Sequence, residues 1–80
     1  MIKLNKAFDY LEKVIEEIEG KIEVLEEKIS AIEENACDRD RDVTEAEQKR
    51  IDRFEEHIEE LEAEKDEIEN ALDYLRDYVA

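Results

Sequence analysis

Apolar residues recur along this chain at alternating spacings of four and three residues. The first half carries them at Leu4, Phe8, Leu11, Ile15, Ile18, Ile22, Leu25, Ile29, Ile32 and Ala36. The second half repeats the spacing at Ile51, Phe54, Ile58, Leu61, Lys65, Ile68, Leu72, Leu75 and Val79, with Lys65 as the charged member. This heptad pattern is typical of the a and d positions of a coiled coil, so it predicts two long helices with one apolar stripe each.

The two heptad patterns do not join into one helix. Between them lies ENACDRDRDVTEAEQ, residues 33–47, which contains neither Gly nor Pro. Continuing the first pattern past Ala36 would put Arg39, Arg50 and Arg53 at core positions, and the second pattern is one residue out of step with it. We therefore expect the chain to turn back on itself.

A capping signal marks where the second helix begins. Thr44 followed by Glu47 forms a capping box, in which each residue satisfies a free backbone N–H group of the first turn. The sequence therefore predicts a single domain, residues 1–80, with a helix at 3–36, a turn at 37–43 and a helix at 44–79. The expected fold is an all-α antiparallel two-helix coiled-coil hairpin, which dimerisation would turn into a four-helix bundle.

Lys65 is the exception among the core positions. If facing residues have numbers that add to 83, the layers run from Leu4 with Val79 at the open end to Ile32 with Ile51 near the turn. Lys65 then faces Ile18. A buried polar residue at such a position can fix the register. Alternatively, the Lys65 ammonium extends along the surface to a flanking glutamate, which is the interpretation we favour.

The e positions beside the core form an acidic flank. In the antiparallel register its members face each other as Glu12 with Glu69, Glu19 with Glu62, and Glu26 with Glu55. Facing like charges destabilise a helix pair slightly. The flank is either a solvated surface of an acidic protein or a recognition surface for a basic partner. On the opposite flank, Lys21 is expected near Glu64 and Lys28 near His57.

A second apolar set lies beside the core at the open end of the hairpin. Its members are Ala7, Tyr10, Val14, Ala71, Tyr74 and Tyr78, which include all the tyrosines of the chain. Tyrosine is enriched in interface anchors. The rings either cover a fraying end of the core, or they form a contact patch for a second copy of the hairpin or for another protein.

The charge restricts the class of partner. The chain has 27 acidic and 12 basic side chains, a net charge of −15. Direct binding to nucleic acid or to an anionic membrane is not expected, because both require cationic patches. A basic protein surface, including one that normally holds DNA or RNA, would attract the chain.

No apolar run approaches the ~20 residues of a membrane span. The N-terminal segment lacks the continuous apolar stretch of a signal peptide. The single cysteine cannot form an internal disulfide, so we expect a cytoplasmic protein.

Motifs for chemistry are nearly absent. Asp38, Asp40 and Asp42 have the alternating spacing of a calcium loop, but Val43 stands where that loop needs Gly and Lys49 where it needs Glu. No catalytic triad and no glycine-rich phosphate loop can be assembled. We expect no enzyme, no metal and no cofactor.

One stretch, RDVTEAEQKRIDRFEEHIEELEAEK at residues 41–65, resembles known proteins. It is similar to small acidic coiled-coil proteins of phages and prophages, and to the helical N-terminal arms of tailed-phage major capsid proteins. The capsid shell domain is absent here, so the resemblance implies a mobile-element origin rather than a capsid role.

Two functions remain as hypotheses. The first is a phage or mobile-element protein that occupies a basic surface of a nucleic-acid-binding or host-defence protein and inhibits it. The second is a self-associating assembly protein, a homodimer joined through the tyrosine patch. The expected partner-binding residues are Glu12, Glu19, Glu26, Glu55, Glu62, Glu69, Tyr10, Val14, Tyr74 and Tyr78.

Overall fold

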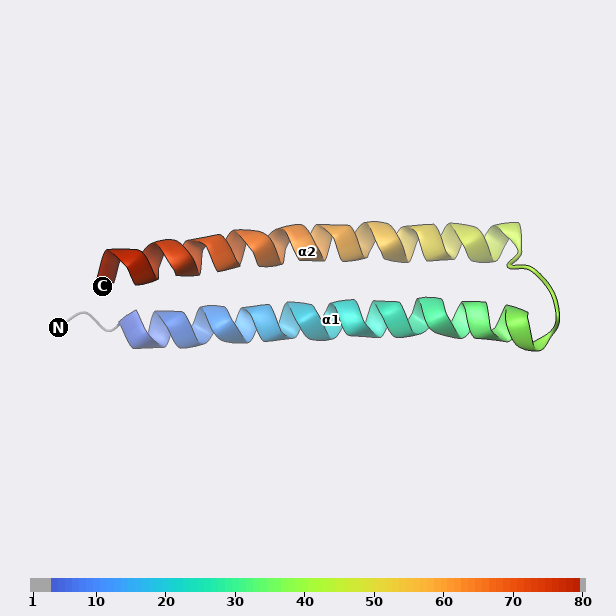
Figure 1. Cartoon of the computed structure of the whole chain (residues 1–80), viewed down its shortest axis with the longest axis horizontal. Coiled ribbons are helices and arrows are strands. Elements are labelled where there is room, and N and C mark those ends of the chain that lie inside the picture. The colour runs from blue at the N-terminus through green and yellow to red at the C-terminus, as the bar shows by residue number, and fades with distance from the viewer. Residues whose placement is uncertain (1–3, 80) are drawn as a thin grey trace.

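The chain folds into two antiparallel helices joined by a short turn (Figure 1), as a computed structural model shows. The structure describes residues 4–79, and the side chains of residues 5–78. Helix α1 spans Leu4–Asp38 and helix α2 spans Glu45–Val79. The hairpin measures 62 × 16 × 14 Å. The predicted all-α hairpin is confirmed. The layer of Leu4 with Val79 lies outside the described side chains, and the helix start at residue 3 lies outside the described residues.

Helix α1 ends two residues later than the sequence predicts, at Asp38 rather than at residue 36. The chain leaves the helix through Asp40, which has a positive φ of 53°. The N–H of Asp40 donates to the carbonyl of Cys37 at 3.0 Å, and that of Arg41 to the carbonyl of Ala36 at 3.1 Å. This is a Schellman ending, in which an aspartate takes the left-handed position that usually belongs to glycine.

Helix α2 begins with the predicted capping box. The N–H of Glu47 donates to Thr44 Oγ1 at 3.1 Å, and the N–H of Thr44 donates to Glu47 Oε1 at 3.0 Å. Arg41 adds two hydrogen bonds to the same carboxylate, at 2.7 and 3.2 Å. These bonds, with the Arg41 guanidinium first, lower the pKa of Glu47 from 4.5 to about 2. Arg41 in the turn is thereby hydrogen-bonded to the first turn of α2.

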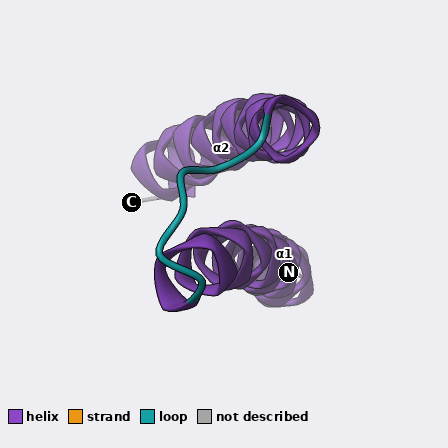
Figure 2. Cartoon of the chain, turned by 90° about the vertical axis from the view of Figure 1, so that its right-hand side faces the viewer, coloured by secondary structure: helices purple, strands orange, loops and turns teal. Residues whose placement is uncertain are grey.

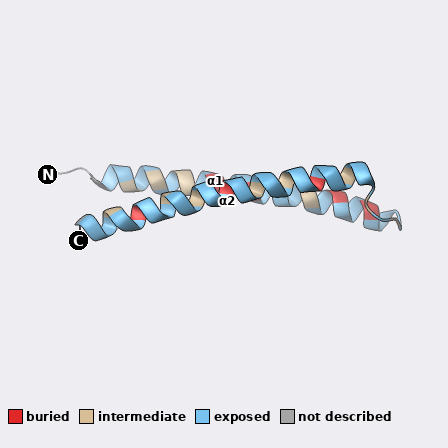
Figure 3. Ribbon diagram, turned by 90° about the horizontal axis from the view of Figure 1, so that it is seen from above, coloured by how far each residue is buried: buried red, intermediate tan, exposed pale blue. Residues whose placement is uncertain are grey.

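The core lies along the contact line of the two helices. Ile18, Ile22, Leu25 and Leu61 form a buried cluster, against which Ile58 and other half-buried side chains pack. The cluster joins residues that the predicted register pairs, such as Ile22 with Leu61. Buried positions recur along the contact line toward both ends (Figure 3). The helices are inclined to each other, as the view from the turn shows (Figure 2). Residues on both sides of the contact line are exposed, so the hairpin has two long side faces open to solvent.

Candidate protein-binding faces

The glutamates of the acidic flank are exposed on one side of the hairpin. Glu19, Glu26 and Glu62 line a shared groove of about 350 Å³. Lys65 lies in the same groove, between acidic side chains of both helices. Glu55 is exposed but does not line this groove. The structure therefore brings three of the six predicted glutamates around one recess.

Two cations interrupt the acidic flank toward the open end. Arg76 Nη2 donates to Glu12 Oε1 at 3.0 Å, a pairing between the helices that the sequence analysis missed. Lys65 Nζ lies 3.8 Å from Glu69 Oε1, so its ammonium reaches a flanking glutamate, in agreement with the interpretation we favoured. The flank is thus less uniformly repulsive than expected, because Glu12 and Glu69 each have a cationic neighbour. Both pairs are solvent-accessible and stabilise the fold by about 1 kcal/mol or less each.

The acidic surface is wider than the six predicted glutamates. The b positions of both heptad patterns border the flank and are also largely acidic and exposed. We define the acidic face by Asp9, Glu12, Glu16, Glu19, Glu23, Glu26, Glu33, Asp52, Glu55, Glu59, Glu62, Asp66, Glu69 and Asp73, with Arg76 as its basic residue. The heptad count that identifies the e positions identifies these b positions as well.

The tyrosines of the open end extend into solvent. Tyr10 is 67% exposed, Tyr74 is 70% exposed and Tyr78 is 77% exposed. The rings of Tyr74 and Tyr78 stack on each other with centroids 6.5 Å apart. Rings so exposed cover little of the core beneath them. Val14, by contrast, is half-buried and packs against the core cluster, so it supports the patch from below rather than projecting from it.

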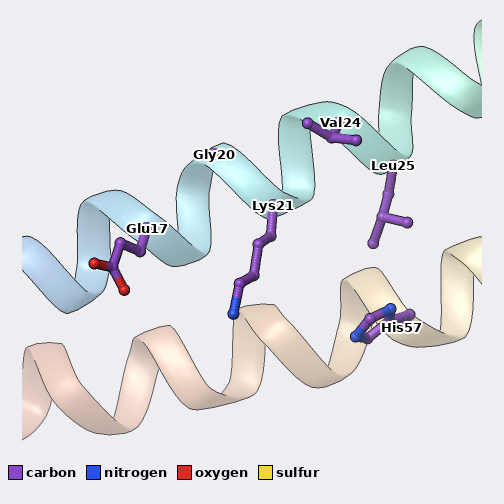
Figure 4. Close-up of a pocket in the computed structure, with 6 residues that line it drawn as sticks. All are labelled: Glu17, Gly20, Lys21, Val24, Leu25 and His57. Carbon is purple, nitrogen blue, oxygen red and sulfur yellow. The ribbon is translucent and has the colours of Figure 1, made fainter.

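A groove that the sequence analysis missed lies on the opposite side, near the middle of α1 (Figure 4). It measures about 450 Å³, and the atoms exposed within it are almost all apolar, although three of its lining residues carry polar groups. The lining residues are Glu17, Gly20, Lys21, Val24, Leu25 and His57. The sequence signals were a lone glycine within a helix and a valine one turn later, outside the heptad core.

The groove belongs to a second long face, made by the c and g positions. We define this mixed face by Tyr10, Val14, Glu17, Lys21, Val24, Lys28, Arg50, Arg53, His57, Glu60, Glu64, Glu67, Tyr74 and Tyr78. Its four glutamates balance its four lysines and arginines, and Asp38, the remaining charged c position, leaves one net negative charge, in contrast to the acidic face. Lys28 lies with its ammonium 5.9 Å from the centre of the Phe54 ring, whereas His57 lines the groove together with Lys21. The hairpin is therefore electrostatically two-sided.

Within residues 4–79, no three His, Cys, Asp or Glu side chains are grouped so that they could hold a metal ion. Cys37 is exposed and free.

Comparison of the chain with protein-family models, with curated proteins and with solved structures gives no match. The resemblance of residues 41–65 to phage proteins thus stays a prediction. Neither described helix contains an apolar stretch of the length that a membrane crossing needs.

Proposed function

We propose that the hairpin is a non-enzymatic protein-binding module whose acidic face occupies a basic surface on a target protein. The target surface is one that normally holds nucleic acid, so that occupation inhibits it. The observation that carries the proposal is the groove in which Glu19, Glu26 and Glu62 converge from two helices, within a face of exposed carboxylates. The resemblance of residues 41–65 favours a phage or mobile-element origin, with a host protein as the target.

The geometry of the acidic face supports this proposal. Its carboxylates follow both helices over roughly 40 Å, at 1.5 Å of rise per residue. This gives about one carboxylate per 3 Å of hairpin, roughly half the charge density of double-stranded DNA. A groove built to hold a polyanion would therefore meet a comparable row of negative charges. The helices also hold these charges in fixed positions, so little ordering is needed on binding.

Capture from a bacterial lysate tests the proposal. We expect the wild-type hairpin to retain a basic protein. Added duplex DNA should release it, because DNA and the hairpin compete for one cationic surface, and raised salt should release it, because salt screens their attraction. Glu19→Lys with Glu26→Lys should abolish this capture. Retained proteins whose binding changes neither with duplex DNA nor with the double substitution would overturn the proposal.

The matched control reverses the same number of charges on another part of α1. Glu27→Lys with Glu34→Lys changes the net charge equally, at exposed f positions outside the acidic face. We expect this variant to retain most of the captured protein. Equal loss in both variants would mean that net charge alone, rather than the acidic face, attracts the partner.

A second candidate function is self-association through the open end, as in an assembly protein. The observation that favours it is the exposure of Tyr10, Tyr74 and Tyr78, since exposed aromatic side chains grouped together mark contact surfaces. Tyr74→Ala with Tyr78→Ala tests this candidate. If that variant no longer retains a partner protein while Glu19→Lys with Glu26→Lys still does, the open end rather than the acidic face carries the function.

A further inference from the structure

The mixed face carries the exposed apolar groups of the hairpin. Among residues 5–78, the large hydrophobic side chains that are most exposed are Tyr10, Val24, Tyr74 and Tyr78, and all of them belong to this face. Its charges also nearly balance, whereas the acidic face would repel a copy of itself. An apolar, nearly neutral face is the side on which this acidic chain can approach another one.

Val24 and Gly20 form a protrusion and a hollow one helical turn apart on α1. Val24 is 49% exposed. At Gly20, apart from its two chain neighbours and the adjacent helix backbone, no atom lies within 4 Å of the position that a Cβ would occupy, and the apolar groove opens beside it. Glycine inside a helix costs about 1 kcal/mol relative to alanine. Packing within the hairpin does not explain this cost, because the space at Gly20 is open.

We propose that two copies of the hairpin pack through their mixed faces as an antiparallel two-fold dimer centred between Gly20 and Val24. An axis at this point brings each Val24 to the partner's Gly20. Residues of α1 whose numbers add to about 44 then face each other, as do residues of α2 that add to about 122. The interface is isologous, so the protrusion and the hollow are each used twice.

The fit of Val24 to the hollow at the partner's Gly20, rather than the order of charges, selects this arrangement. In the antiparallel dimer Glu17 comes opposite the partner's Lys28, and Glu67 comes opposite the partner's Arg53. If the two turns lay side by side instead, Glu17 would meet the partner's Glu67, and Lys28 would meet the partner's Arg53. The antiparallel order also brings Glu60 opposite the partner's Glu64, and side-by-side turns would bring Lys21 opposite the partner's Glu64, so each order has favourable and unfavourable pairs.

The open-end tyrosines and the face area fit the same dimer. Tyr74 comes opposite the partner's Arg50, where a guanidinium can stack on the ring. A side of a hairpin that measures 62 × 16 Å offers on the order of 1,000 Å², against the about 800 Å² per partner that a stable interface buries. The dimer leaves both acidic faces open. The inference therefore goes beyond the proposed function and does not depend on it.

Sedimentation equilibrium tests whether the dimer forms through this face. Val24→Glu places a charge over the hollow and should raise the dimer dissociation constant at least about tenfold, with unchanged helicity. Ser30→Glu adds the same charge at an exposed b position beside the acidic face and should change that constant by less than about threefold. A wild-type chain that stays monomeric at millimolar concentration, or a Val24→Glu variant that dimerises like wild type, would overturn the inference.

Pulsed electron paramagnetic resonance tests the arrangement in the chain as it is. Cys37 is the single cysteine of the sequence and is exposed, so a spin label attaches there without further substitutions. The antiparallel dimer places two such labels about 45 Å apart, since each lies about 15 residues from the axis. Labels within about 20 Å would show side-by-side turns, and labels near 100 Å would show association through the open ends. Either result contradicts the antiparallel dimer.

Discussion

Lys65→Leu should stabilise the hairpin, because Lys65 stands at a core position that the predicted register places opposite Ile18. Ile18 is 5% exposed, whereas the Lys65 side chain keeps 28% of its surface in solvent. Full burial of a leucine side chain stabilises a protein by about 1.5–3 kcal/mol. The lysine stem already covers part of this apolar surface, so roughly half of that gain, about 0.8–1.5 kcal/mol, is available.

The loss of the ion pair offsets part of that gain. Lys65 Nζ lies 3.8 Å from Glu69 Oε1, and an exposed pair at this helical spacing contributes about 0.3–0.5 kcal/mol. The net expectation is about 0.5–1 kcal/mol, which corresponds to a rise in Tm of about 2–8 °C for a chain of this size. Urea unfolding followed by circular dichroism, at one fixed protein concentration, measures the change.

A matched variant separates burial from charge. Lys65→Gln removes the same positive charge without adding apolar surface, so we expect its Tm to equal that of wild type or to fall slightly. A fall in Tm for Lys65→Leu would refute the reasoning. It would mean that the ammonium stabilises the carboxylates of its groove, Glu19 and Glu62 among them, by more than the gain from burial.

Three further predictions concern the turn and the acidic face. Asp40→Gly should raise stability by about 0.5–1 kcal/mol in chemical unfolding, because glycine adopts the φ of 53° without the steric cost that aspartate bears. Glu47→Gln should be less stable than wild type at neutral pH, and the difference should close as pH falls from about 4.5 to 2 in thermal melts. The reason is that the folded pKa of Glu47 lies at about 2, so the Arg41 hydrogen bonds stabilise only the ionised carboxylate. Glu19→Lys with Glu26→Lys should keep the helical circular dichroism and leave Tm unchanged or slightly raised, because it removes like-charge repulsion.

Each of these expectations has a contradicting result. An Asp40→Gly variant of lower stability would show that the aspartate side chain stabilises the turn by more than its backbone strain costs. A Glu47→Gln difference that persists at pH 2 would mean that the carboxylate charge does not stabilise the capping box. Loss of helicity in the double glutamate variant would mean that these carboxylates hold the hairpin together.

The helices and their antiparallel order follow from the sequence because they depend on periodicity. The heptad spacing locates each helix, and the phase slip together with the Thr44 capping box requires a turn. The end of α1 was harder to predict, since Asp40 adopts a left-handed conformation that glycine usually signals. The pairing of Arg41 with Glu47 depends on the path of the turn, which no sequence spacing specifies.

The candidate faces were predictable only in part, for a related physical reason. The heptad count places Glu19 and Glu62 on one flank, and the structure brings both to one groove. The count places Val14 beside the core but does not say how deeply it packs, because that depends on the local separation of the helices. The groove at Gly20 and Val24 lies outside the a and d positions, so an interpretation built on the core alone overlooks it.

The affinity of the captured basic protein for the hairpin, measured across a salt series, tests the proposed function most directly. For wild type we expect the affinity to fall steadily as salt rises, because the acidic face acts through charge. Glu19→Lys with Glu26→Lys should weaken binding at least about tenfold at low salt, with a difference that shrinks at high salt, whereas Glu27→Lys with Glu34→Lys should weaken it less than about threefold. A salt-independent affinity, or an equal loss in both double variants, would contradict recognition by the acidic face.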